Sequence, residues 1–170
     1  MKVPLNIPLY IFLLLIGFFG FLFSIFLRQD ISLSVFLVFI GVGGFILSSY
    51  IFYTKRCDKP LVCPTGSNCS KVIYSEYSKF FGIPLEYLGM LYYTFIATFY
   101  AALIIIPSLI PQNVIFLAFL VTSAGFLFSL YLIAVQAFAL KQWCMWCLLS
   151  AMFSMTIFIV SFSKLAVGVP

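Results

Sequence analysis

The chain has 170 residues, of which 65% are hydrophobic, 20% are aromatic and only 8% are charged. Soluble domains carry roughly 25% charged residues, and a domain of this length exposes much of its surface to water. The composition therefore predicts an integral membrane protein and excludes a secreted disulfide scaffold, a disordered chain and a nucleic-acid module. The sequence contains no His, which excludes Ser-His and Cys-His catalysis and His metal ligands. Its five Cys residues are then the best candidates for chemistry.

Long uncharged stretches divide the chain into predicted membrane helices. About 20 apolar residues cross the hydrocarbon layer as a helix. By this criterion the sequence predicts five helices, at about 5–27, 32–53, 87–107, 112–139 and 145–166. The first apolar stretch is too long for a signal peptide. Pro107 and Pro111 are predicted to turn the chain between the third and fourth helices.

A polar loop at 55–86 joins the second and third predicted helices and carries most of the charged residues. Within it, four apolar residues have the spacing of one helix face: Ile73, Tyr77, Phe80 and Phe81. This spacing predicts an amphipathic helix over 70–81 that ends at Gly82 and lies on the membrane surface as a lid over the bundle. Glu76 and Glu86, in the same loop, are predicted to be solvated charges at the rim.

Cys144 and Cys147 form a C-x-x-C motif at the predicted start of the last helix. This spacing places both sulfurs on one face of the first turn, where they can form a disulfide or hold a metal. The positive end of the helix dipole favours the reactive thiolate at that position. A chance pair of helix cysteines is the alternative.

The order of the spans brings the loop cysteines and the C-x-x-C motif to one face of the membrane, because two helices separate them. Sulfurs that meet there can pass electrons by thiol–disulfide exchange. Four thiolates could instead bind zinc, but five residues separate Cys57 from Cys63 and Cys63 from Cys69. That spacing differs from the short knuckles of zinc ribbons, so no metal site is predicted.

Several motifs, taken in order, resemble the vitamin K epoxide reductase family. They are Cys63-Pro-Thr-Gly-Ser-Asn-Cys69 followed by Ser75, then Gly82-Ile-Pro84, then Gly89-Met-Leu-Tyr-Tyr93, and finally the C-x-x-C motif that opens the last core helix. The resemblance covers about residues 31–167. It implies an all-α four-helix bundle at 31–170 that encloses a quinone, with residues 1–30 as an additional N-terminal membrane helix.

The resemblance also implies a function, that of a membrane thiol:quinone oxidoreductase that makes disulfides in a separate thioredoxin-like partner. Cys63 and Cys69 would take electrons from this partner, and Cys69 would exchange with Cys144. Cys147 would pass the electrons to a quinone of the menaquinone or ubiquinone class. The residues expected to contact the quinone are Ser75, Tyr93, Trp146 and Cys147.

Two positions differ from the animal enzymes of this family. Ala151 stands where those enzymes have a Tyr, and Leu85 stands near their quinone-binding Asn. These differences argue against vitamin K epoxide as the substrate. Cys57 has no expected partner and is predicted to be a bystander. The alternative function is that of a non-catalytic membrane assembly protein with structural cysteines.

Two further features of the sequence bear on the membrane. Trp143 and Trp146 flank the C-x-x-C motif, and anchoring at the membrane interface is the alternative to quinone contact. With five spans, the cations expected on the cysteine side are Lys2, Lys55, Arg56, Lys59, Lys71, Lys79 and Lys141, against Arg28 and Lys164 on the other side. The positive-inside rule then predicts a cytoplasmic cysteine face, whereas the family resemblance implies an extracytoplasmic one.

Overall fold

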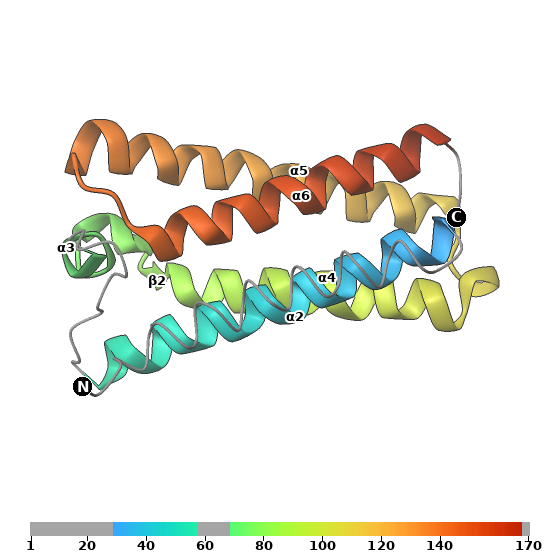
Figure 1. Ribbon diagram of the computed structural model, residues 1–170, viewed down its shortest axis with the longest axis horizontal. Helices are drawn as coiled ribbons and strands as arrows, with labels where there is room; N and C mark the ends of the chain where they lie inside the picture. The colour runs from blue at the N-terminus through green and yellow to red at the C-terminus, as the bar shows by residue number, and fades with distance from the viewer. Residues whose placement is uncertain (1–28, 58–68, 168–170) are drawn as a thin grey trace.

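The computed structural model describes residues 29–57 and 69–167. Four long helices run side by side in this part of the chain (Figure 1): α2 (Gln29–Arg56), α4 (Leu85–Ile105), α5 (Gln112–Ala134) and α6 (Met145–Val167). Each is long and apolar enough to cross a membrane. The prediction of an all-α membrane protein is confirmed. The predicted first span, 5–27, lies outside the described residues.

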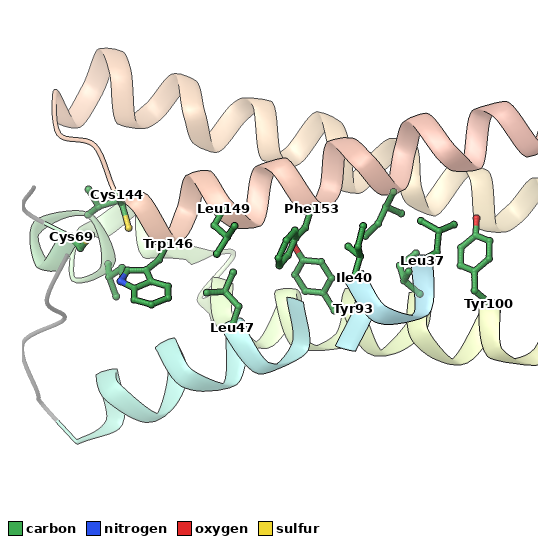
Figure 2. Packing of buried hydrophobic residues seen from close by; sticks show 14 of the residues in the cluster. Leu37, Ile40, Leu47, Cys69, Tyr93, Tyr100, Cys144, Trp146, Leu149 and Phe153 are labelled. Atoms are coloured by element: carbon green, nitrogen blue, oxygen red, sulfur yellow. The ribbon is translucent and has the colours of Figure 1, made fainter. Parts of the chain in front are cut away.

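The helices pack as two pairs, α2 against α4 and α5 against α6, and contacts between α2 and α6 join the pairs. Buried apolar side chains from α2, α4 and α6 fill the centre (Figure 2). Gly44 lets α4 approach α2, since a Cβ at this position would overlap the ring of Tyr93. The Tyr93 hydroxyl then reaches α6, where it donates to the Ser150 carbonyl at 2.9 Å and lies 2.8 Å from the Ser150 Oγ. Tyr93 therefore links the α2–α4 pair to the α5–α6 pair.

A 3-10 turn precedes α5 and a π-helical turn follows it. Before α5, the chain leaves α4 through a short 3-10 turn, η2 (Pro107–Leu109), as the two prolines predict. After α5, the helix widens into a π-helical turn, η3 (Val135–Leu140), which extends the span to the predicted boundary. Lys141 adopts a left-handed conformation with φ of 49° and ends this turn. Such π-helical turns often occur at functional sites, and this one leads directly to Cys144.

The predicted amphipathic helix over 70–81 is wrong. The chain forms a single helical turn, α3 (Cys69–Ile73), then a 3-10 turn, η1 (Glu76–Ser78). A two-stranded antiparallel hairpin follows, made of β1 (Lys79–Phe80) and β2 (Ile83–Pro84). We call this segment, residues 69–84, the cap, because it lies over one end of the bundle (Figure 1).

Two local features stop the cap from continuing as a helix. The Ser75 hydroxyl donates to the Val72 carbonyl at 2.7 Å and so competes with helical hydrogen bonding. Phe81 and Gly82 both have positive φ angles, 51° and 83°, as a two-residue hairpin turn requires. Gly82 is therefore a turn residue and does not end a helix. Phe81, predicted on the apolar face, is 91% exposed at the tip of the hairpin.

Candidate functional site

A cavity of about 530 Å³ lies between the cap and the adjoining ends of all four long helices. This volume is in the range of small-molecule sites, about 300–1,000 Å³. Most of its lining is apolar. Polar side chains, among them Ser75, Ser78, Glu86, Gln136, Ser150 and Ser154, contribute only a small part of its surface. The cavity therefore suits an apolar molecule that carries a small number of hydrogen-bonding atoms.

Two of the candidate cysteines are fully buried at the cap end of the bundle. Cys69 begins α3 and is disulfide-bonded, while Cys144 immediately precedes α6 and is free. Both belong to the same buried cluster, and Figure 2 shows them at the same end of the bundle, close to Trp146. Cys63, the expected partner of Cys69, lies outside the described residues.

The position of Cys144 is fixed through the π-helical turn. Its backbone N–H donates to Gln136 Oε1 at 2.9 Å, and Gln136 is almost completely buried. Cys144 thus occupies the N-cap position of α6, where a side chain can accept hydrogen bonds from the free N–H groups of the first turn. Sequence reasoning did not identify Gln136, because its partner lies eight residues along the chain, beyond one helical turn.

Hydrogen bonding stabilises the thiolate form of Cys144. The bond to the Cys147 side chain lowers the pKa of the Cys144 thiol. Burial opposes this shift, and the backbone N–H groups of Cys147 and Trp146 lower the pKa further. The net direction is below the ordinary value, because hydrogen bonds to the charged form favour it. The sequence-based expectation of thiolate stabilisation at this helix start therefore has a specific structural cause.

Cys147 connects the C-x-x-C motif to the cavity. Within the described ranges it is the cysteine that lines the cavity wall, and its side chain is hydrogen-bonded to Cys144. Both thiols are free. This arrangement places a redox-capable dithiol with one sulfur against the apolar space and the other on the side of the cap.

The other expected quinone contacts also line the cavity, in different ways. Trp146 is fully buried there and packs against Tyr50, with ring centroids 5.5 Å apart. The Ser75 hydroxyl donates to the Val72 carbonyl, and the Tyr93 hydroxyl donates to the Ser150 carbonyl of α6. Trp143, by contrast, is half exposed.

Two further positions singled out in the sequence also reach this space. Leu85 and Ala151, the positions that differ from the animal enzymes, both line the cavity. Cys57 is free and exposed, just beyond the end of α2. Within residues 29–57 and 69–167, no cluster of three Cys, Asp or Glu residues could hold a metal ion.

The expectation that Glu86 is a solvated rim charge is wrong, although Glu76 is exposed as expected. Glu86 lies in the first turn of α4, is only 8% exposed and lines the cavity. Its Oε1 accepts a hydrogen bond from Lys55 Nζ at 2.9 Å. The same ammonium group donates to Ser78 Oγ at 3.1 Å and so joins α2 to the cap. One signal was present in the sequence, since Lys55 and Glu86 are opposite charges at the facing ends of two consecutive spans.

Comparison with known proteins agrees with this geometry. The sequence profile described as the Vitamin K epoxide reductase family matches residues 35–162. A search among curated proteins finds no match. The matched range includes every described residue that lines the cavity, as well as the C-x-x-C motif. The chain therefore belongs to the vitamin K epoxide reductase family, whose members are membrane oxidoreductases that work with thiols and quinones.

Proposed function

We propose that this protein makes disulfides in a separate thioredoxin-like dithiol protein and passes the electrons to a quinone of the menaquinone or ubiquinone class. One observation carries the proposal. Cys147 lines an apolar cavity while its side chain is hydrogen-bonded to Cys144, which is buried in the same cluster as the disulfide-bonded Cys69. Thiol–disulfide exchange requires sulfurs that can touch, and the burial of Cys69 and Cys144 in one cluster supports such a series from the cap to the cavity.

The proposed electron path has three steps. The partner dithiol reduces the Cys63–Cys69 disulfide and becomes a disulfide itself. The Cys69 thiol then attacks the Cys144–Cys147 disulfide at Cys144, and Cys63 resolves the Cys69–Cys144 mixed disulfide, so that the Cys63–Cys69 disulfide re-forms and Cys144 and Cys147 become thiols. Finally, the Cys144–Cys147 dithiol closes again, and its two electrons and two protons convert a quinone to a quinol. The lowered pKa of Cys144 supports its role in exchange, because a thiol of lower pKa leaves a mixed disulfide more readily.

The cavity fits the head group of a quinone on chemical grounds. Its wall is mainly apolar, and the buried Trp146 indole and Tyr93 ring offer flat surfaces for an aromatic ring. Trp146, Tyr93, Ser75 and Cys147 are the residues that would contact it. A bound quinone would supply the electron acceptor there. The chain's own residues orient it, exclude water and hold the Cys147 sulfur against it.

The test is a quinone assay on the protein purified in detergent. We expect a chloroform–methanol extract to contain quinone, and we expect the protein to reduce a short-chain quinone when a thioredoxin-like dithiol protein is supplied. Cys69→Ser should abolish the reaction, whereas the exposed Cys57 provides a matched control, because Cys57→Ser should retain most activity. A protein that neither contains nor reduces quinone would refute the proposal and favour structural cysteines.

We also propose that the cysteine end of the bundle faces the cytoplasm, in a five-span arrangement with residues 1–30 as an additional helix ahead of a core at 31–170. Among the described cations, those in the cap or at the adjoining helix ends are Lys55, Arg56, Lys71, Lys79 and Lys141. At the opposite end, Lys164 is buried and donates to Ser34 Oγ. This asymmetry supports the cytoplasmic assignment by the positive-inside rule.

Cys57 is a direct reporter of this orientation, because it is free and exposed at the cap end. A membrane-impermeant maleimide should label Cys57 only after cells are lysed, and Cys57→Ser should remove that labelling. Labelling of Cys57 in intact cells would place the cap outside the cytoplasm.

A further inference from the structure

Glu86 is a buried charge on the cavity wall that the thiol relay leaves unexplained. Its carboxylate belongs to a side chain that is only 6% exposed, on a wall that is otherwise mainly apolar. Burying a carboxylate is costly unless its charge is paired and its oxygens are hydrogen-bonded. Lys55 pairs with the charge, but it does so through Oε1 alone.

The second oxygen, Oε2, is buried and has no hydrogen-bond partner among the residues that the structure describes. An unsatisfied buried acceptor costs about 1–3 kcal/mol, and more when it is charged. A salt bridge with a purely structural role would gain by satisfying both oxygens. The vacant oxygen instead belongs to a side chain that lines the cavity and interacts electrostatically with Cys147.

From this geometry we propose that Glu86 is a catalytic residue that accepts the proton of the Cys147 thiol and delivers it to the quinone in the cavity. The inference rests on the proposed function. Lys55 supplies an opposite charge to the carboxylate through Oε1, and Oε2 has no hydrogen-bond partner among the described residues. Glu86 would then supply an oxygen that is free to bind a proton, on the cavity wall that also carries the reacting sulfur of Cys147.

Two S–H bonds break and one S–S bond forms between Cys144 and Cys147, which releases two electrons and two protons. The quinone takes up both electrons, and its two oxygens each take one proton to give the quinol. Glu86 Oε2 carries the protons one after the other and returns to the carboxylate each time. The hydrogen bond between Cys144 and Cys147 gives the second proton the same route.

Glu86→Gln tests the proposal, because glutamine keeps the shape and one acceptor oxygen but cannot take up a proton. The measurement is the single-turnover rate at which the pre-reduced protein reduces a short-chain naphthoquinone, followed as a function of pH. We expect the rate to fall by a factor of about 100, a typical contribution of general acid–base catalysis. Quinone affinity, measured by quenching of Trp fluorescence, should change by less than about threefold, because proton transfer does not contribute to ground-state binding. Glu76→Gln is the matched control, since Glu76 is exposed in the cap, and it should leave the rate unchanged.

The pH profile separates proton transfer from a structural role. The titratable groups that face Glu86 are Lys55 from α2 and Cys147 from α6, with Tyr77 of the cap and Tyr92 and Tyr93 of α4 on the same cavity wall. Among the described residues, α5 adds no titratable side chain to this wall. The dependence of the rate on pH should differ between wild-type protein and Glu86→Gln, whereas Glu76→Gln should keep the wild-type dependence.

A double variant, Lys55→Gln/Glu86→Gln, keeps the test valid if the single variant does not fold. It replaces the ion pair by two neutral amides that can hydrogen-bond to each other. We expect the double variant to fold and to remain slow. Recovery of the wild-type rate in it, or a wild-type rate and pH profile in Glu86→Gln, would overturn the role of Glu86. If wild-type protein itself fails to reduce quinone, the proposed function is what has failed, and this inference fails with it.

Discussion

Gln136→Met is the substitution that most directly tests how the C-x-x-C motif is positioned. Methionine has a similar length but no acceptor, so the Cys144 N–H, which belongs to a fully buried residue, would lose the partner it now has at 2.9 Å. Leaving a buried donor unsatisfied costs about 1–3 kcal/mol. Since about 1.4 kcal/mol corresponds to a factor of ten in an equilibrium constant, local opening of the first turn of α6 should become roughly 5- to 150-fold more frequent.

Amide hydrogen exchange in detergent, read by mass spectrometry on peptides that contain Cys144, measures this opening. We expect protection of that peptide to fall by the stated factor in Gln136→Met, with slower quinone reduction because Cys147 is held less firmly against the cavity. Thr98→Val is the control, because the Thr98 hydroxyl bonds only within α4, on an exposed face, at 2.8 Å to the Thr94 carbonyl. Unchanged protection in Gln136→Met would refute the argument that Gln136 positions Cys144.

Three other predictions concern the dithiol and the helix packing. Cys144→Ser should stop quinone reduction but leave Cys147 as a single thiol against the cavity, so that a thiolate–quinone charge-transfer absorbance appears. If this absorbance appears only in Cys147→Ser, Cys144 is the cysteine that contacts the quinone and Cys147 is the one that exchanges with the cap. Because the pKa of Cys144 lies below the ordinary thiol value, its thiolate is lost only when the pH falls through that lowered pKa. The rate at which Cys144 exchanges with the cap disulfide, followed by stopped flow, should therefore stay high down to a lower pH than for an ordinary cysteine. A rate that already falls near the pKa of an ordinary thiol would contradict this. Gly44→Val should place methyl groups into the Tyr93 ring and destabilise the bundle by about 1–3 kcal/mol, the usual cost of overpacking. This loss should appear as a lower thermal unfolding midpoint in detergent. Val42 is exposed, so Val42→Ala should leave that midpoint almost unchanged.

The sequence alone determined the spans between residues 29 and 167 and the place of the C-x-x-C motif at a helix start. The physical reason is the bilayer, which demands long apolar helices because no water is present to satisfy the backbone. Pro107 and Pro111 then mark the turn between two spans, because proline cannot continue a helix. These signals are local, so they can be read without knowledge of any contact between distant residues.

Local patterns failed in the cap, where two interactions compete. The spacing of Ile73, Tyr77 and Phe80 satisfies a helical period, but the Ser75 hydroxyl bond and the turn at Phe81 and Gly82 favour a hairpin. Short apolar sets of this kind fit more than one structure. Packing against the bundle ends decides between them, and the pattern of one segment does not contain that information.

Only the tertiary structure decided which groups share the cavity. Whether Glu86 faces water or the interior depends on the rotation of α4 about its axis, which is set by side-chain packing such as that of Tyr93 on Gly44. Its pairing with Lys55 joins residues 31 positions apart. The bond between Gln136 and Cys144 likewise depends on the π-helical turn that carries the chain from α5 to α6. The sequence thus identified the candidate thiols from their own chemistry. Their polar neighbours come from separate helices, and only the packing of those helices brings them together.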